Sequence, residues 1–308
     1  MRRRVYIAAS QSPHHGDGDF RWPSSTYYSC MKYGVHAGLW MARWTDDIAP
    51  ILRIVADLGF DGVEISLLGM TDERATALAG LIRDHGLLVT CSDGLSREAD
   101  VTSEDADIRA AGLAHLRWAI RTVAAIGGRS LAGVVHTPWG LFDPANKAAR
   151  AARSAEMLGQ LHADLDSHGV TLGIEALNRF ETDLANTATE ACALARASGS
   201  RHIGVLLDTF HMNMEEKDIR QAIAGAADKL VHFHVSDNDR GVPGSGHVPW
   251  DHVRGGLKDA AYDRWIVTEM FVKTGTPAGN DLNIWRDIEP DATGAARQAL
   301  AFMQATFG

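Results

Sequence analysis

The sequence predicts a single (β/α)8 barrel, also called a TIM barrel. Three observations predict this fold: the length, a series of short apolar segments, and amphipathic helical segments that alternate with them. The chain has 308 residues, which suits one large α/β barrel better than two full-sized domains. A doubly wound open sheet is the competing fold. It would normally carry a Gly-rich phosphate-binding turn after the first strand, and Gly34–Gly38 lacks that pattern.

Eight segments have the apolar, β-rich character of strands that are covered on both faces. We expect strands at Tyr33–His36, Gly62–Ser66, Leu87–Cys91, Ser130–Val135, Thr171–Glu175, Ile203–Asp208, Leu230–Val235 and Trp265–Glu269. After Met31 no linker or low-complexity segment marks a domain boundary, so residues 31–308 are expected to form one catalytic domain.

The segments between the strands have apolar residues at helical spacing. In the segment 46–58 these residues recur every three or four positions, and Gly59 is a suitable helix stop. We expect helices at Asp46–Leu58, Asp72–His85, Asp107–Ile126, Lys147–His168, Thr187–Ser198, Glu215–Asp228, Asp251–Ala261 and Thr293–Thr306.

Composition restricts the class of protein. Hydrophobic residues make up 45% and charged residues 22%, as in an ordinary globular chain, and the formal charge is −9. An acidic balance disfavours a nucleic-acid partner, and no apolar run approaches the roughly 20 residues of a membrane span. The three cysteines (Cys30, Cys91 and Cys192) form no disulfide framework. The sequence therefore predicts a cytoplasmic protein without nucleic acid or membrane as partner.

The first thirty residues differ from the rest of the chain. They contain three consecutive arginines, the pair His14-His15 and a Pro/Ser/Tyr stretch, without sustained periodicity. The arginines are not followed by the apolar core of an export signal. We expect a flexible N-terminal extension over residues 1–30, and Met31 is a candidate for the start of the functional chain.

Four metal-binding residue types stand at the ends of four consecutive strands. In a (β/α)8 barrel the reactive groups come from the carboxyl ends of the strands, and those ends carry Glu175, Asp208, His234 and Glu269. Clustered carboxylates repel one another unless a cation compensates them. An oxygen-rich set with one imidazole suits Mn²⁺, Mg²⁺ or Co²⁺. One such acid alone would more often cap a helix, and either His232 or His234 could simply pack.

Further polar and aromatic side chains are expected around the same rim. Glu181 lies in the loop after the fifth strand, His211 follows Asp208 by three residues, and Arg240 lies in the Gly/Pro-rich loop after the seventh strand. Aromatic side chains that could wall a small polyol follow the first, fourth and eighth strands: Trp40, Trp44, Trp139 and Phe271. Ordinary loop packing is the alternative for each of them.

Four motifs carry a resemblance to a known family. They are Ile174–Glu181, Leu207–Asn213, His232-Phe-His234 with Arg240 downstream, and Thr268–Phe271. In this order they resemble the ketose 3-epimerases, which include the D-tagatose and D-allulose (psicose) 3-epimerases of the xylose isomerase-like TIM barrel superfamily. The resemblance covers essentially residues 31–308.

The resemblance implies a metal-dependent C3 epimerisation of a free ketose. It implies that Glu175, Asp208, His234 and Glu269 hold one divalent metal, Mn²⁺ first and Co²⁺ or Mg²⁺ next. It also implies that Glu181, His211 and Arg240 contact the sugar near C1 and C2. Inversion at C3 passes through a cis-enediolate, and a proton leaves one face of the sugar and arrives on the other. Glu175 and Glu269 can act as the base and the acid for these two transfers. Relatives of this type are commonly homodimers or homotetramers.

Some positions depart from the family pattern and leave the preferred ketose open. The loop after the seventh strand reads Asp237–Arg240 where typical members have Glu-Ala-Asn-Arg, and Gly244–Trp250 also differs. His36 stands where many relatives place an aromatic residue. We therefore expect His36, Trp40 and Trp139 to contribute to the substrate wall.

Other readings of the same strand ends remain open. An aldose–ketose or hydroxypyruvate isomerase would use the same metal and enediolate chemistry. A sugar-phosphate 3-epimerase would need more cationic side chains near the rim to bind the phosphate than Arg240 and Lys273. From other classes, an endonuclease IV-like nuclease would need a His-rich multi-metal site and a DNA groove. A non-catalytic sugar-binding protein would not need both Glu175 and Glu269.

Overall fold

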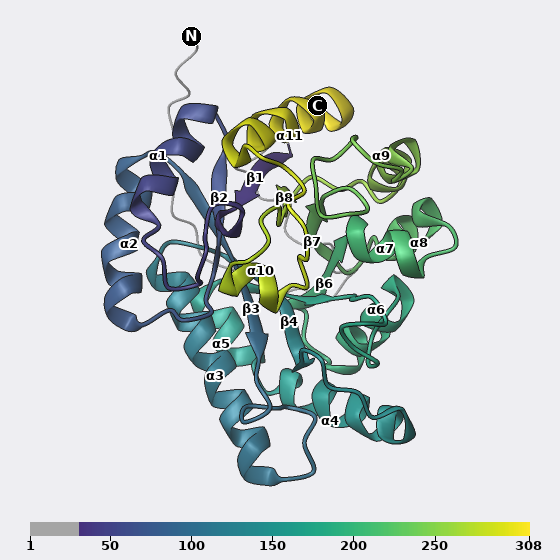
Figure 1. The fold of residues 1–308 in the computed structure, drawn as a ribbon. Coiled ribbons are helices and arrows are strands. Elements are labelled where there is room, and N and C mark those ends of the chain that lie inside the picture. The colour runs from purple at the N-terminus through teal and green to yellow at the C-terminus, as the bar shows by residue number, and fades with distance from the viewer. Residues whose placement is uncertain (1–30) are drawn as a thin grey trace, which may run out of the picture.

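A computed structural model describes residues 31–308, which form one closed barrel domain. The predicted extension, residues 1–30 with Cys30, lies outside the described residues. Eight parallel strands pair in sequence order, and β1 pairs with both β2 and β8, so the sheet closes on itself. The helices surround the strands as an outer ring (Figure 1). The predicted (β/α)8 barrel is confirmed.

The strands are short except where two of them extend toward the top of the barrel. They are β1 (Lys32–His36), β2 (Gly62–Ser66), β3 (Leu88–Leu95), β4 (Ser130–Pro138), β5 (Thr171–Glu175), β6 (Ile203–Asp208), β7 (Leu230–Val235) and β8 (Trp265–Thr268). The bounds of β2, β5, β6 and β7 are those predicted. Glu269 follows β8 directly, and its N–H donates to the carbonyl of Val235 at 3.1 Å, so its backbone remains beside β7.

The helices cover the outside of the barrel. They are α1 (Ala49–Leu58), α2 (Asp72–Asp84), α3 (Ala106–Ala125), α4 (Lys147–Gly159), α5 (His162–His168), α6 (Ala188–Ala197), α7 (Thr209–Glu215), α8 (Ile219–Gly225), α9 (Trp250–Asp259), α10 (Pro277–Asp281) and α11 (Ala292–Phe307). Two short 3-10 turns, η1 (Ala37–Leu39) and η2 (Pro144–Asn146), precede α1 and α4.

Two helix predictions were wrong. The segment Lys147–His168 is broken after α4, where the N–H groups of Gln160 and Leu161 bond to carbonyls three residues back, a tighter turn that redirects the chain. The predicted helix Glu215–Asp228 is instead the end of α7 and the separate helix α8. The backbone of Glu216 is extended and ends α7, and Asp218 accepts the N–H of Gln221 as the N-cap of α8, so the segment is divided there.

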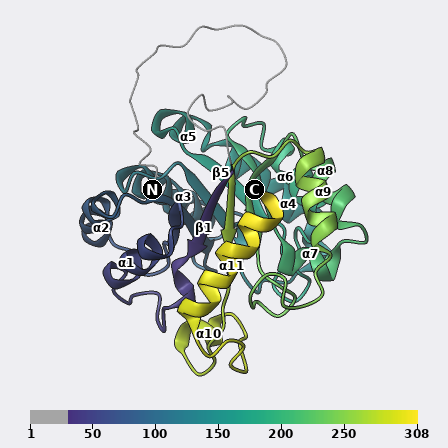
Figure 2. The same ribbon diagram turned by 90° about the horizontal axis from the view of Figure 1, so that it is seen from above.

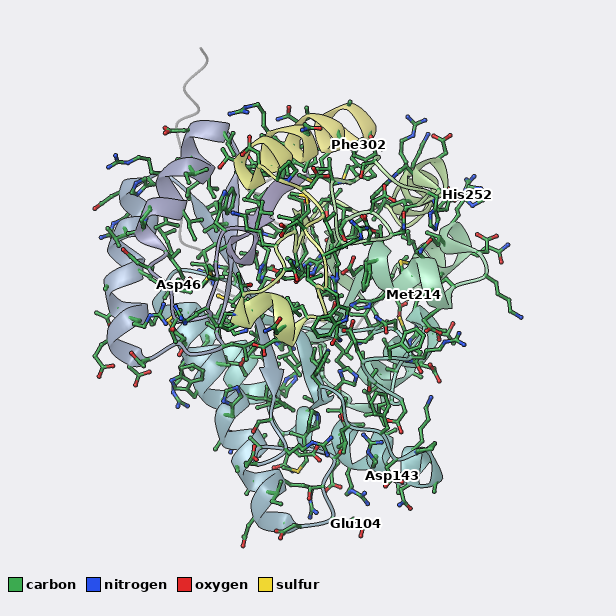
Figure 3. All side chains as sticks on the ribbon, in the orientation of Figure 1. Asp46, Glu104, Asp143, Met214, His252 and Phe302 are labelled. Atoms are coloured by element: carbon green, nitrogen blue, oxygen red, sulfur yellow. The ribbon has the colours of Figure 1, made fainter. Side chains whose placement is uncertain are left out.

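The core lies between the sheet and the helices and continues into the barrel. Val35, Ile65, Leu116, Leu158 and Phe233 are fully buried. The last helix, α11, packs against β1 and β8 and crosses the barrel beside them (Figure 2). Side chains fill the interior of the molecule, whereas Glu104 and His252 lie on its outer surface (Figure 3). Within residues 31–308, no helix combines the length and apolar character that crossing a bilayer requires.

Candidate active site

The four predicted metal-binding residues meet at the carboxyl ends of their strands. Each of Glu175, Asp208, His234 and Glu269 offers one ligand atom, and these four atoms lie within 4.8 Å of one another. All four residues are buried. The convergence follows from the topology, because parallel strands of a closed barrel all end on the same face.

Arg240 supplies positive charge inside this cluster. Its Nη1 donates to Asp208 Oδ2 and to Glu269 Oε2, each at 2.8 Å, and its guanidinium carbon lies 4.0 Å from the centre of the Phe210 ring. The backbone of Arg240 is left-handed, with φ of 68°, and its N–H donates to the carbonyl of Asp237. The tight turn therefore directs a long side chain back into the barrel.

The two glutamates of the cluster have opposite pKa shifts. Burial raises the pKa of Glu175, and His211 beside it only partly offsets this effect. Burial would also raise the pKa of Glu269, but His234 and Arg240 hold the pKa of that carboxyl far below its ordinary value. Two carboxyl groups in one site thus differ in their affinity for a proton, which is the property that an acid and base pair needs.

The donor set fits a divalent cation. Three carboxylates and one imidazole converge, and Nδ1 of His234 has no hydrogen-bond partner among residues 31–308. It lies 3.5 Å from Glu269 Oε2, while Nε2 of the same ring faces away, toward Glu64. Oxygen ligands with a single nitrogen suit a hard divalent ion.

Glu181, His211 and Trp139 form a second group beside the cluster. Asn178 joins them: its side-chain N–H groups reach Glu181 Oε1 at 2.8 Å and His211 Nδ1 at 2.9 Å. Trp139 Nε1 donates to Glu181 Oε2 at 3.1 Å. Nδ1 of His211 also accepts the backbone N–H of Asn178, so Nδ1 does not carry the ring hydrogen. Nε2, the other ring nitrogen, lies 3.4 Å from Glu175 Oε1.

The structure brings His36 into the site but places Trp40 elsewhere. The ring nitrogens of His36 contact Ser92 Oγ at 2.9 Å and the N–H of Gly38 at 3.1 Å, and its ring lies edge-on to Phe271 and Trp44. The indole N–H of Trp40 instead donates to Thr293 on α11 at 3.1 Å. The turn η1 separates the two residues and sends their side chains in different directions.

A cavity of about 580 Å³ opens beside these groups. Glu181, Arg240 and Phe210 line its inner part, and Phe180 and Trp285 lie at its exposed end. This volume is typical of small-molecule sites, which are mostly apolar with a few polar groups.

Sequence reasoning missed Glu64 and Asn178. Glu64 lies within β2, is fully buried, and contacts His232 and His234 across the barrel. A glutamate inside an otherwise apolar strand was the available signal, because a carboxylate is rarely buried without a partner. Asn178 lies in the Ile174–Glu181 motif, but only the folded loop shows its two contacts.

The chain is similar to known proteins along most of its length. The family profile described as xylose isomerase-like TIM barrel matches residues 52–306. D-psicose 3-epimerase of Agrobacterium fabrum is 35% identical over 288 residues, which covers 90% of this chain and 100% of the relative. L-ribulose 3-epimerase of Mesorhizobium japonicum is 32% identical over 275 residues, covering 88% and 93%.

Solved structures give the same result. A crystal structure of D-psicose 3-epimerase in the presence of D-fructose superposes with a TM-score of 0.86 at 35% identity, covering 90% of this chain and 100% of that one. D-psicose 3-epimerase with D-tagatose from Clostridium cellulolyticum H10 superposes with a TM-score of 0.85 at 31% identity, covering 90% and 99%. The chain belongs to the xylose isomerase-like TIM barrel family and, within it, to the ketose 3-epimerases.

Proposed function

We propose that this protein is an isomerase that inverts the configuration at C3 of a free ketose. The relatives named D-psicose and L-ribulose 3-epimerases support this activity and the substrate class. The observation that carries the proposal is the convergence of Glu175 and Glu269 with Asp208 and His234 in one buried cluster. A sugar-binding protein without turnover would not need both Glu175 and Glu269 in this cluster.

We further propose that this cluster holds one divalent metal. Glu175, Asp208, His234 and Glu269 would be its ligands, and Mn²⁺ suits the donor set best, with Co²⁺ or Mg²⁺ as alternatives. When bound, such an ion supplies Lewis-acid stabilisation of negative charge on the oxygens at C2 and C3 of the sugar.

Glu175 and Glu269 would move the proton at C3. They extend from different sides of the barrel, Glu175 from β5 and Glu269 from the end of β8. Glu269, with its lowered pKa, is ionised and can accept the C3 proton from one face, leaving a cis-enediolate of the sugar. Glu175, with its raised pKa, can return a proton to the other face. The roles exchange when the starting ketose has the opposite configuration.

The surrounding residues would bind and orient the sugar. Glu181, His211 and Arg240 are placed to contact the C1 and C2 end, with Trp139 holding the Glu181 carboxylate. His36 would contribute to the wall on the opposite side. Since the Trp40 indole is directed to α11, we assign the aromatic part of that wall to Trp44 and Phe271.

The remaining partners and the location are also proposals. We propose a cytoplasmic enzyme whose partners are the ketose and further copies of the same chain, as a homodimer or a homotetramer. The net charge of −9 gives it no general attraction for nucleic acid.

Proton NMR in D₂O tests the reaction. Metal-stripped protein is incubated with D-fructose, D-tagatose, D-allulose or an L-ketose, with and without Mn²⁺, and the ion is removed by chelator before the spectra are recorded. Metal-dependent deuterium at C3 together with the C3 epimer is the expected result. Deuterium at C1 or C2 with an aldose product would instead indicate an aldose–ketose isomerase. Absence of exchange in every free ketose would contradict the proposal.

A pair of variants separates an enzyme from a binding protein. Glu269→Gln should lower turnover by about 10²- to 10⁴-fold, and its metal content is measured in the same sample. Glu156→Gln, on the exposed face of α4, is the matched control and should behave as the wild type. Full turnover by a metal-loaded Glu269→Gln variant would remove Glu269 from the mechanism.

A further inference from the structure

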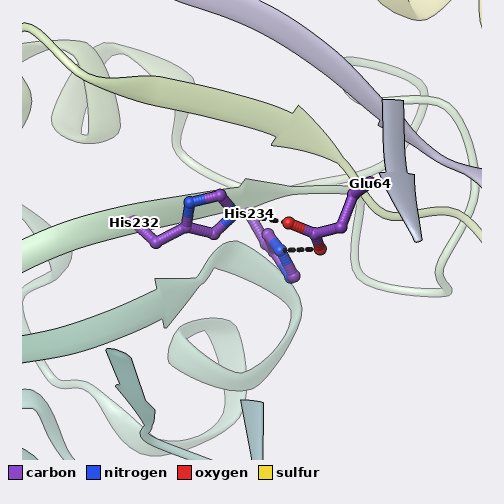
Figure 4. Close-up of side chains that lie close together, drawn as sticks. All are labelled: Glu64, His232 and His234. Atoms are coloured by element: carbon purple, nitrogen blue, oxygen red, sulfur yellow. Dashed lines mark ion pairs between the residues drawn. The ribbon is translucent and has the colours of Figure 1, made fainter. Parts of the chain in front are cut away.

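Glu64, His232 and His234 form a buried cluster directly beneath the proposed metal site. Glu64 lies on β2, and the two histidines lie on β7 across the barrel. Their exposed fractions are 0 to 1%. Figure 4 shows the Glu64 carboxylate facing both imidazoles, with one ion pair to each ring. Only one member of this cluster, His234, belongs to the four-residue metal group.

Each oxygen of the Glu64 carboxylate has its own partner. Oε1 lies 2.7 Å from Nε2 of His234, and Oε2 lies 2.7 Å from Nε2 of His232. Thr90 Oγ1 donates to Oε2 at 2.8 Å. The two histidine contacts are close ion pairs whose atoms do not align as in a linear hydrogen bond.

The position of the Glu64 carboxylate, 2.7 Å from Nε2, decides which nitrogen of His234 can bind a metal. A neutral imidazole carries one hydrogen, and the negative charge of Glu64 favours that hydrogen on Nε2, the nearer nitrogen. The lone pair is then on Nδ1, on the opposite side of the ring. That atom lies 3.5 Å from Glu269 Oε2 and has no hydrogen-bond partner among the described residues. The ring therefore presents its ligand atom to the four-residue group.

A second metal site within Glu64, His232 and His234 is the competing interpretation. Their ligand atoms also lie within 4.8 Å of one another. Two atoms that bind the same ion at about 2.1 Å and at right angles are separated by about 3 Å. The nitrogen–oxygen separations of 2.7 Å are shorter than this and match direct charge-assisted contacts. The distances favour a cluster without a metal between its members.

We propose that Glu64 is a positioning residue for the metal site, which fixes the tautomer and orientation of His234. His232 and Thr90 hold Glu64 in place from its other oxygen. The inference rests on the proposed function only in taking the four-residue group as a metal site, and not on the identity of the ketose. A carboxylate behind a metal-binding histidine typically changes metal affinity by one to two orders of magnitude.

Glu64→Gln tests this role with almost no change in volume. The amide removes the charge and can turn an N–H toward His234, which favours the tautomer with hydrogen on Nδ1. We expect the affinity of the full-length protein for Mn²⁺, measured by EPR of the free ion, to fall by about 10- to 100-fold. Turnover should recover substantially at saturating Mn²⁺. Glu156→Gln, the same substitution on the exposed face of α4, is the matched control and should keep the wild-type affinity for Mn²⁺.

Three results would overturn the proposal. The first is a natively folded Glu64→Gln variant, by thermal melting, with unchanged Mn²⁺ affinity. The second is two ions per wild-type chain, since that favours a metal within the Glu64 cluster. If the variant does not fold, ¹⁵N NMR of histidine in the wild type loaded with diamagnetic Mg²⁺ decides the matter: hydrogen on Nε2 of His234 with the metal on Nδ1 supports the proposal, and the reverse arrangement overturns it. A wild type whose Mn²⁺ affinity depends on Glu64 but which epimerises no ketose would contradict the proposed function alone.

Discussion

Two glutamates with almost the same burial differ in their affinity for protons. The exposed fraction is 6% for Glu175 and 9% for Glu269, so burial alone cannot separate their pKa values. The difference comes from their neighbours: Glu269 faces His234 and Arg240, whereas Glu175 faces His211, whose charge is shared with Glu181. The protonation of the two glutamates before the sugar binds is therefore set by a few surrounding groups, and the configuration of the sugar at C3 decides which of them removes the proton.

This arrangement predicts that each glutamate serves one epimer. Glu175→Gln and Glu269→Gln should each lower the rate of epimer formation by about 10²- to 10⁴-fold. Because the remaining carboxylate still removes a proton from its own face, each variant should still exchange the C3 hydrogen of one epimer with D₂O. Proton NMR that starts from each epimer separately measures both rates. Metal content is the control, and equal loss of exchange from both epimers in metal-loaded variants would contradict the two-glutamate mechanism.

His36 offers a second test at the scale of a single residue. Both of its ring nitrogens are engaged, one with Ser92 Oγ and one with the N–H of Gly38, so the ring is fixed beside the site. His36→Phe removes this polar wall and should raise KM for the preferred ketose by about tenfold, with a smaller change in kcat. Initial rates over several ketoses measure the effect. Trp40→Phe is the control because its indole is directed to α11. A loss confined to kcat would argue against a binding role.

At the scale of elements, the apolar strands could be predicted and the polar strand extensions could not. The strands β3 and β4 continue beyond Cys91 and Val135 into Ser92-Asp93-Gly94 and His136-Thr137-Pro138. These residues look like loop signals in a sequence, but Ser92–Gly94 still pair with β4, and after a register shift Leu95 pairs with Pro138. Strand ends in this fold carry polar site residues, and those residues interrupt the very pattern that reveals a strand.

The candidate site, too, could be predicted only where the positions of its residues follow from the strand order. Glu175 and Asp208 close their strands, so the topology alone brings them together. Glu64 and His234 come from strands on opposite sides of the barrel, and their contact depends on side-chain length and on the barrel's diameter. The position of Trp40 after the first strand predicts a place in the substrate wall. The conformation of the turn η1, which the sequence does not reveal, directs it to α11 instead.

The strand β4 contains a buried histidine that should make the fold acid-sensitive. Burial first and Arg150 second lower the pKa of His136 to about 3, and neither ring nitrogen has a hydrogen-bond partner among residues 31–308. An unfolded histidine has a pKa of about 6.5. The folded state therefore binds this proton less readily. Stability is full above about pH 6.5 and falls by up to about 1.4 kcal/mol for each pH unit below it, until the folded pKa is reached.

His136→Phe should remove this contribution to acid sensitivity. We expect the free energy of unfolding of the variant to decrease less than that of the wild type between about pH 7 and pH 4.5. Urea denaturation at several pH values measures it. His252→Gln, on the exposed face of α9 (Figure 3), is the control and should follow the wild type. Parallel curves for the wild type and His136→Phe would show that His136 is not responsible.

At the scale of the whole molecule, apolar side chains gather at the mouth of the cavity. Phe180 and Trp285 have exposed fractions of 72% and 70%, the highest among the large hydrophobic residues of the described chain. They come from different segments, the loop after β5 and the segment between α10 and α11, yet they line one cavity. Neighbouring exposed aromatic residues commonly mark a surface that another protein covers.

The proposed homo-oligomer should therefore depend on these two residues. Burying one large apolar side chain contributes about 1.5–3 kcal/mol, so the double variant Phe180→Ser/Trp285→Ser should weaken subunit association by about 10²- to 10⁴-fold. Sedimentation velocity over a range of concentrations measures the dissociation constant. Phe142→Ser, an exposed aromatic residue near η2, is the matched control and should assemble as the wild type. A wild type that stays monomeric, or a double variant that assembles normally, would contradict an interface here. Since the same two residues border the cavity, KM of the dissociated variant would then show how far a neighbouring subunit completes the substrate site.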